Sequence, residues 1–410
     1  QFETILFRLC YLCVFFENHT YMLLKEVGED KSLQRIFLQF PVRLYASDSN
    51  WIRPLDTDVA NVFDPKKNGH FKHGEAIRWI LFDDKGTAIG RVAAFYEPSK
   101  DEVPVGGMGF FECIEDETAA FLLFDACKSW LLSKGMQGMD GPINFGERDS
   151  FWGLMVKGWE YEPTYKMPWT KAYYIDFFEK YGFQDYFQQY VYVSSITGAN
   201  VTPAIEEKAN RIYQNPEYVF RHIEKSNLSK YAEDFKVIFN AAWAKFPGVK
   251  EMSSEQAQRL VKTMKPIIDE QLLWFAYTQT GDPVAFFIVI PDLNQIIKHL
   301  NGRLNWWGMI KFLLLKMRGA LTRACGVIFG VVPDHQGKGV ESAIALRFRT
   351  AARENPFYPY ETMDMNWVGD FNPKMLRFVS QLGATNEKTY ITYRLFFNPD
   401  QPFSRCPKVG

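Results

Sequence analysis

The stretch that decides the fold reads Val331-Val-Pro-Asp-His-Gln336-Gly337-Lys338-Gly339-Val340-Glu341-Ser342. An apolar, strand-like segment (325–332) leads into it, and an apolar segment with helical periodicity (343–352) follows at once. The two glycines let backbone N–H groups converge at a helix start, whose partial positive charge suits an anion, and Lys338 adds a full charge. The stretch therefore indicates a pyrophosphate site, with an ordinary strand-to-helix turn as the alternative.

Two common nucleotide-binding patterns are excluded. The stretch lacks the Gly-x4-Gly-Lys-Ser/Thr of a Walker loop and the Gly-x-Gly-x-x-Gly of dinucleotide folds. The run Gly106-Gly-Met-Gly109 is a poor match to the second pattern, because a strand follows it and not a helix.

An internal repeat organises the chain. The turn Asp84-Lys-Gly86 with its following apolar strand matches Gln279-Thr-Gly281 with its own, and each pair indicates a β-hairpin. About 100 residues later, two helices end at Gly182 and Gly383 and lead into further strands. We therefore expect two copies of one unit, each a mixed sheet with helices on both faces, which is an α/β (α+β) fold class.

Around this stretch, a strand is followed by Val-x-Pro-x-x-Gln-Gly-Lys-Gly, a helix and a second strand, and then Asn372 opens a helix that ends at Leu382-Gly-Ala384. This order of elements resembles the GNAT acetyltransferase superfamily. The resemblance implies two tandem GNAT-like domains of the uncharacterised bacterial type. It also implies that acetyl-CoA or another acyl-CoA is the co-substrate, without a metal. The implied cofactor-binding residues are Val331, Val332, Gln336, Gly337, Lys338, Gly339, Val340 and Asn372.

The sequence departs from the family pattern in several places. Glu341 stands where the family has Gly or Ala, and Val379 and Phe178 stand where it has a tyrosine that protonates the departing thiolate. In the first copy, Glu115-Asp-Glu117 occupies the helix start and would repel a pyrophosphate. We therefore expect the second copy to bind the cofactor.

The expected boundaries divide the chain into three parts. Residues 22–195 form an N-terminal GNAT-like domain with a degenerate cofactor loop, and residues 196–410 form the acyl-CoA-binding domain. Residues 1–21 are expected to be a non-native or flexible extension. Their apolar run is too short for a membrane span, and a polar segment typical of a folded domain begins at Met22.

Composition excludes other classes. A net charge of −1 gives no global attraction to nucleic acid, so no nucleic-acid partner is expected. The six cysteines lack the spacing of a disulfide framework or zinc site, which favours a cytoplasmic location.

One segment departs from this neutral balance. Residues 293–333 contain six Lys or Arg residues and no acid, and they include the apolar stretch 304–318. Three interpretations stay open for it: a lid over an anionic or acyl-bearing substrate, peripheral membrane contact, and a core helix with solvated bases. Arg303, Trp306 and Trp307 are its candidate substrate-binding residues.

Amine acylation needs a base and donors for the thioester oxyanion. Asp364 and Asn366 share one face of a predicted strand (361–368), so Asp364 is the candidate base and Asn366 a substrate contact, with a structural Asp as the alternative. Tyr390 or Tyr393 could replace the missing acid, and backbone N–H groups near Val331 and Val332 could hold the oxyanion. The loops 140–149 and 163–174 add the substrate-binding candidates Asn144 and Tyr174.

The sequence thus predicts an acyl-CoA-dependent N-acyltransferase, with acetyl-CoA as the first candidate donor and an unidentified amine acceptor. The alternative is a non-catalytic or membrane-peripheral acyl- or lipid-binding protein on a degenerate fold. Aminoacyl transfer of the peptidoglycan type is a third option, although no long helical hairpin is apparent.

Overall fold

The computed structural model describes residues 13–14, 21–98, 102–198, 203–213, 215, 217–243 and 251–409. Most of the expected N-terminal extension, residues 1–12 and 15–20, lies outside this part. The strands are β1 (Cys13–Val14), β2 (Met22–Glu26), β3 (Glu75–Phe82), β4 (Ala88–Tyr96), β5 (Val105–Cys113), β6 (Gly138–Gly141), β7 (Leu154–Lys157), β8 (Gln184–Ser195), β9 (Tyr218–His222), β10 (Leu273–Thr278), β11 (Pro283–Pro291), β12 (Arg323–Val331), β13 (Thr362–Gly369) and β14 (Thr385–Phe396).

The helices are α1 (Lys31–Leu44), α2 (Asp56–Val62), α3 (Glu117–Ser133), α4 (Tyr174–Tyr181), α5 (Pro203–Tyr213), α6 (Leu228–Trp243), α7 (Ser254–Met264), α8 (Asn294–Ile297), α9 (Trp306–Met317), α10 (Val340–Glu354) and α11 (Pro373–Gln381). Short 3₁₀ turns are η1 (Gly69–Lys72), η2 (Lys225–Asn227), η3 (Glu270–Leu272) and η4 (Pro333–His335). All strands join one mixed sheet, in the order β1-β2-β3-β4-β5-β6-β14-β8-β13-β12-β11-β10-β9, with β7 paired to β14. The α/β class is confirmed.

In the N-terminal half, alternate residues of β3 face opposite helical layers. Ile80 packs with Phe37 of α1, whereas Leu81 packs with Phe124 of α3. This is the alternation that a strand imposes on its side chains, and it buries both faces of the sheet.

The C-terminal half repeats the arrangement. Phe286 of β11 lies 4.8 Å from Phe235 of α6, measured between ring centroids, and Phe287 lies 5.4 Å from Phe348 of α10. Both expected hairpins are present, between β3 and β4 and between β10 and β11. Gly86 and Gly281 in their turns adopt the left-handed φ values of 75° and 93°, which glycine adopts without strain.

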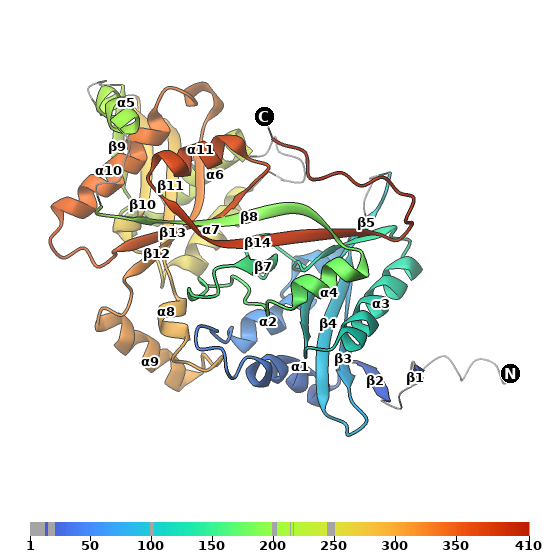
Figure 1. Cartoon of the computed structure of the whole chain (residues 1–410). Helices are drawn as coiled ribbons and strands as arrows, with labels where there is room; N and C mark the ends of the chain where they lie inside the picture. Colours follow the sequence, from blue (N-terminus) through green and yellow to red (C-terminus); the bar gives the residue numbers. More distant parts are fainter. Residues whose placement is uncertain are drawn as a thin grey trace.

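The last strand of each copy crosses to the other half of the sheet. β14, near the C-terminus, pairs with β6 of the N-terminal half, and β8, which ends the first copy, pairs with β13 of the second. β8 and β14 also pair with each other and run side by side through the centre of the molecule (Figure 1). One continuous sheet therefore links the two copies, while the boundary at 195/196 stays a prediction.

The two copies share a second feature at matching strands. β5 pairs in parallel with β6 only over Val105–Gly107, and β12 pairs in parallel with β13 only over Arg323–Gly326. Beyond these points the paired strands separate. Each of β5 and β12 also carries a bulge against its antiparallel neighbour, between Gly109 and Glu112 in β5 and at Val327 in β12.

Candidate functional site

The glycine-rich loop of the C-terminal half has the backbone that its sequence predicts. η4 and Gln336 follow β12, and Gly337 and Gly339 adopt left-handed φ values of 72° and 94° before α10 begins. The Gln336 side-chain amide donates to the Val331 carbonyl at 2.9 Å, which fixes the loop against its strand. Space around Gly337 is open and Lys338 is exposed, so an anion could approach the first N–H groups of α10.

Other members of the predicted cofactor set have structural contacts. The Val332 N–H donates to Val284 O at 2.9 Å, and Val340 is fully buried. Asn372 caps α11 by accepting from the Met375 N–H at 3.1 Å. Oε2 of Glu341 is buried and has no hydrogen-bond partner among the described residues. The loop therefore fits a pyrophosphate in its backbone, and Glu341 is the residue that opposes it.

The predicted base, Asp364, is sealed inside the protein. It is 1% exposed, and its Oδ2 lies 3.1 Å from Nζ of Lys388, which is equally buried. Asn366 is on the same face of β13, as expected, and donates to the Thr164 hydroxyl. Both side chains therefore face the segment 162–164, and a general base would need access that Asp364 lacks in this conformation.

The two candidate acids of β14 are also enclosed. Tyr390 is fully buried, and its hydroxyl has no hydrogen-bond partner among the described residues. Tyr393 belongs to the core of the N-terminal half, where its ring lies 5.4 Å from that of Phe178 and its hydroxyl lies 3.4 Å from Oε1 of Glu179. Burial raises the pKa of both phenols. The roles predicted for them stay predictions.

The predicted substrate residues lie at three separate places. Arg303, Trp306 and Trp307 are exposed at the start of α9. Asn144 is buried behind β5, with its Oδ1 unpaired among the described residues. Tyr174 is buried at the start of α4 and lies beside a pocket that the sequence did not single out.

This pocket lies in the N-terminal half and is a small cavity of about 80 Å³ that is partly open to solvent. α1, α2 and the segment 51–56 form one side, the bulged part of β5 forms the floor, and residues 151–153 and 167–170 close it. The lining is mostly apolar and aromatic, with Arg53, Asp56, Arg91 and Glu112 as its charged residues. An apolar cleft with a few convergent polar groups is the usual form of a small-molecule site.

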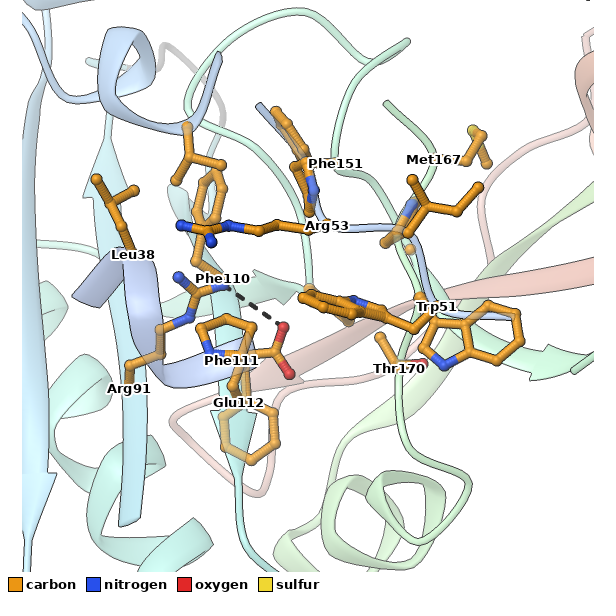
Figure 2. A pocket seen from close by; sticks show the side chains of 18 of the residues that line it. Leu38, Trp51, Arg53, Arg91, Phe110, Phe111, Glu112, Phe151, Met167 and Thr170 are labelled. Atoms are coloured by element: carbon orange, nitrogen blue, oxygen red, sulfur yellow. Dashed lines mark ion pairs between the residues drawn. The ribbon is translucent and has the colours of Figure 1, made fainter. Parts of the chain in front are cut away.

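Glu112 is the chemically notable group in this pocket. Its Oε2 accepts hydrogen bonds from the hydroxyls of Tyr45 and Tyr174, the latter at 3.2 Å. Its Oε1 lies 3.5 Å from Nη2 of Arg91. Figure 2 shows the carboxylate and the Arg91 guanidinium turned toward one another, with Arg53 and Phe151 elsewhere on the pocket wall. Oε2 is thus held by two donors, while Oε1 has a single, longer contact.

Burial raises the pKa of Glu112 to about 7. Arg91 and the two tyrosine hydroxyls favour the ionised form, but they do not offset the loss of water around the carboxylate. A carboxyl group that titrates near neutral pH can both take and release a proton under ordinary conditions.

The backbone around the pocket is strained. Phe110 in the β5 bulge and Phe151 opposite it both have a φ of 51°, and Lys166 has a φ of 66°. Non-glycine residues adopt this region at a cost of about 1–3 kcal/mol each, and such residues cluster at functional sites. Phe110 and Phe151 both line the pocket, and the bulge turns Glu112 toward it.

Solved structures share this architecture over nearly the whole chain. A tandem GNAT protein from the clavulanic acid biosynthesis pathway matches with a TM-score of 0.54 at 10% identity, covering 93% of this chain and 100% of that one. The chain has a tandem GNAT fold. The GCN5-related glucosamine N-acetyltransferase region of a fungal multidomain β-N-acetylglucosaminidase matches with a TM-score of 0.53 at 13% identity, covering 91% of this chain and 38% of that one. The predicted tandem GNAT fold is thereby confirmed.

Two curated relatives align with most of this tandem GNAT chain. A protein of Caulobacter vibrioides named bacterial ceramide synthase is 27% identical over 363 residues, which cover 87% of this chain and 93% of that protein. Protein YghO of Escherichia coli is 25% identical over 372 residues, covering 89% and 93%. No model of a known protein family matches the chain.

The GNAT copies divide the site features between them. The C-terminal copy has eight residues between β12 and α10, and these form the glycine loop. The N-terminal copy has only three residues between β5 and α3. There Asp116 caps the helix by accepting a hydrogen bond from the Ala119 N–H at 2.9 Å. The N-terminal copy instead has the pocket and Glu112. Within the described residues, no three His, Cys, Asp or Glu side chains form a metal site, and no helix is both long and apolar enough to cross a membrane.

Sequence reasoning missed Glu112, although a signal was present. Arg91 and Glu112 are single charges within the apolar strands β4 and β5, and the two strands are adjacent in the sheet. Lone charges of opposite sign on paired apolar strands indicate a buried pair.

Proposed function

We propose that this protein is an acyl-CoA-dependent N-acyltransferase that moves an acyl group from a CoA thioester to the amine of a long-chain acceptor. The single observation that carries the proposal is Glu112, a carboxyl group with a pKa of about 7 in a mostly apolar pocket of a tandem GNAT fold. The name of the Caulobacter relative supports the acceptor class, since a ceramide is the amide of a fatty acid and a long-chain amino alcohol.

In this proposal, Glu112 is the general base. The acyl thioester supplies an electrophilic carbonyl carbon. As the amine nitrogen bonds to that carbon and the carbon–sulfur bond breaks, Oε1 of Glu112 takes the proton that the nitrogen loses. The sulfur leaves with the bonding electron pair as the CoA thiolate, which takes a proton from water to give the free thiol. Tyr45 and Tyr174 hold Oε2, so the carboxylate keeps its orientation while Oε1 receives the proton. The apolar wall binds the acceptor's chain and keeps water away from the reacting groups.

The loop Gln336–Val340 is the candidate site for the CoA pyrophosphate. Its left-handed glycines expose the N–H groups at the start of α10, and the exposed Lys338 contributes charge. This loop belongs to the second GNAT copy and Glu112 to the first, so donor binding and catalysis need separate measurements.

Release of free thiol from acetyl-CoA and palmitoyl-CoA, with a long-chain amino alcohol or ethanolamine as acceptor, tests the reaction, and mass spectrometry identifies the amide. We expect the long-chain acceptor to be preferred and Glu112→Gln to lower kcat/KM about 10²–10⁴-fold. Glu115→Gln, the same change at an exposed position three residues away, serves as the matched control. Wild type that releases no thiol with any donor and acceptor would overturn the proposal.

Calorimetric titration of both acyl-CoA compounds tests the loop. Lys338→Glu should weaken acyl-CoA binding about tenfold, and the factor should be larger at low salt. Lys67→Glu changes an exposed lysine of the N-terminal copy and should leave the binding unchanged. Heat of binding together with no thiol release would favour the second candidate, a non-catalytic acyl-binding protein, for which the burial of the predicted catalytic groups Asp364 and Tyr390 is the supporting observation.

A further inference from the structure

The outer surface of α9 is rich in exposed apolar side chains. Of the fourteen large hydrophobic side chains that are exposed in the described part of the chain, seven lie within residues 304–317. Trp306 and Trp307 are 71% and 72% exposed, and Met317 is 83% exposed. The other four are Leu304, Met309, Leu313 and Leu314. We call these seven residues the outer face of α9.

The inner side of α9 holds the helix to the body of the protein, in part through Nζ of Lys316, which donates to the Pro266 carbonyl at 3.2 Å. Phe312 and Leu315 pack against the C-terminal core, and Gly308 is buried. A helix of a water-soluble domain normally directs its apolar stripe inward, so an outward excess marks an interaction surface. Twelve residues at 1.5 Å each give α9 a length of about 18 Å, which is too short to cross a bilayer core of about 30 Å.

Positive charge surrounds this surface. Residues 293–333 contain no acid. Of their bases, Lys298 and Arg323 form ion pairs with Glu162 and Asp292 of the protein body. Arg303 and Arg318 are exposed before the start and at the end of α9, whereas Nζ of Lys311 donates to the His299 carbonyl at 2.7 Å. An apolar helical face flanked by exposed bases matches the chemistry of an anionic lipid surface.

The turn before α9 is part of the pocket's surroundings. Nη1 of Arg53 donates to Oδ1 of Asn301 at 3.2 Å, and the Asp56 N–H donates to Gly302 O at 2.8 Å. Ile52 packs in one cluster with Leu300, and Phe312 of α9 packs against that cluster. Ile52, Arg53 and Asp56 also line the Glu112 pocket. α9 and one wall of the pocket are therefore connected through the turn before α9 and the cluster that contains Ile52 and Leu300.

We propose that α9 docks this protein on an anionic lipid bilayer, with its outer face in the headgroup layer and α9 parallel to the membrane plane. The two tryptophans sit at the depth where indole rings prefer to lie, and Arg303 and Arg318 contact lipid phosphates. The pocket then lies beside the membrane surface, where an apolar acceptor is dissolved. This last step rests on the proposed function, whereas docking itself does not.

An acidic protein is the competing partner, because a basic segment would attract it too. The outer face favours the bilayer: its seven members are all apolar or aromatic, and the exposed Arg303 and Arg318 lie at its two ends. A surface of this kind gains most from the removal of apolar area from water.

Co-sedimentation of the full chain with phosphatidylcholine vesicles, with and without phosphatidylglycerol, tests the proposal. Wild type should bind the vesicles that contain phosphatidylglycerol, and added salt should weaken this binding. Trp306→Ser/Trp307→Ser should lower the vesicle partition coefficient at least about tenfold, since each exposed indole contributes apolar area. Arg303→Glu/Arg318→Glu should remove the preference for the anionic lipid.

Phe357→Ser is the matched control, because Phe357 is 88% exposed and lies outside α9, after α10. It should bind vesicles as wild type does. Wild type that does not sediment with either vesicle, or a tryptophan double variant that binds as wild type does, would overturn the docking proposal. So would binding of an acidic acyl carrier protein without any vesicle binding. None of these readouts needs turnover, so failure of docking and failure of the proposed reaction are distinguishable.

Discussion

Arg91 and Glu112 lie directly opposite one another on the paired strands β4 and β5, with Nη2 of Arg91 3.5 Å from Oε1 of Glu112. Both side chains are buried, so neither charge has bulk water as a substitute partner. The bulge in β5 places this pair at the floor of the pocket. The strand pairing thus holds an acid and a cation at a position where substrate could reach them.

The activity of the wild type should follow the ionisation of Glu112. Burial raises its pKa to about 7, and only the ionised form can accept the amine proton. We therefore expect kcat/KM to rise about tenfold per pH unit below 7 and to level off above it, once the ionisation of the amine itself has been subtracted. Thiol release measured across this range gives the profile. A corrected profile that is flat through pH 7 would contradict the role of Glu112.

Tyr45→Phe should move this profile to higher pH. The Tyr45 hydroxyl donates to Oε2 of Glu112, and this hydrogen bond favours the ionised carboxylate. Its loss should raise the pKa of Glu112 further, so the acidic limb shifts upward while activity at high pH is largely kept. Tyr96→Phe is the matched control, because Tyr96 makes the equivalent bond to Glu75 at 3.0 Å on the surface. A shift of equal size in both variants would argue against a specific effect on Glu112.

Stability should respond to Glu112 in the opposite sense from activity. The folded-state pKa lies above the ordinary value of 4.5, so the folded protein holds a proton that the unfolded chain releases. This stabilising contribution is fully present below pH 4.5 and is lost as pH rises through 7. In the wild type, the free energy of unfolding should therefore fall between about pH 5 and about pH 8. Urea unfolding should show a smaller fall over this range for Glu112→Gln. Glu115→Gln should retain the wild-type slope.

Local features of this fold could be predicted from the sequence because each has a local cause. Positive φ angles occur at four glycines in the predicted turns and at the predicted helix start: Gly86, Gly281, Gly337 and Gly339. Because glycine adopts such angles without strain, its presence in the sequence marks these positions. The repeat was visible since both hairpins reuse the same turn. The repeat predicts two copies of one unit, and the resemblance to the GNAT superfamily adds which unit it is.

The strand exchange could not be predicted in the same way. A strand's apolar alternation says which face is buried, but not which neighbour it pairs with, so the pairing of β14 with β6 left no mark in the sequence. The Glu112 site has the same origin. Its partner Tyr45 lies 67 residues away in sequence, and the raised pKa exists only because the fold removes water.

Asp364 and Lys388 form another buried pair that the sequence could not connect. Substitution of both residues distinguishes a structural role from the predicted catalytic one. Each is 1% exposed and the two are 3.1 Å apart. Lys388→Met should cost about 3–5 kcal/mol, because it leaves a buried carboxylate without its cation. Asp364→Asn/Lys388→Met should recover part of that loss, since neither charge is then buried.

Urea unfolding of both variants measures these costs, and Lys230→Met calibrates them. Lys230 forms a 2.5 Å pair with Asp234 but is itself exposed, so its replacement should cost no more than about 1 kcal/mol. The rate per folded molecule then decides the role of Asp364. If the pair is structural, the folded double variant should release thiol with a wild-type pH profile. A general base contributes about 10²–10⁴-fold to the rate. If the folded double variant instead loses a factor of about 100 or more in rate, Asp364 is the catalytic base that the sequence predicts.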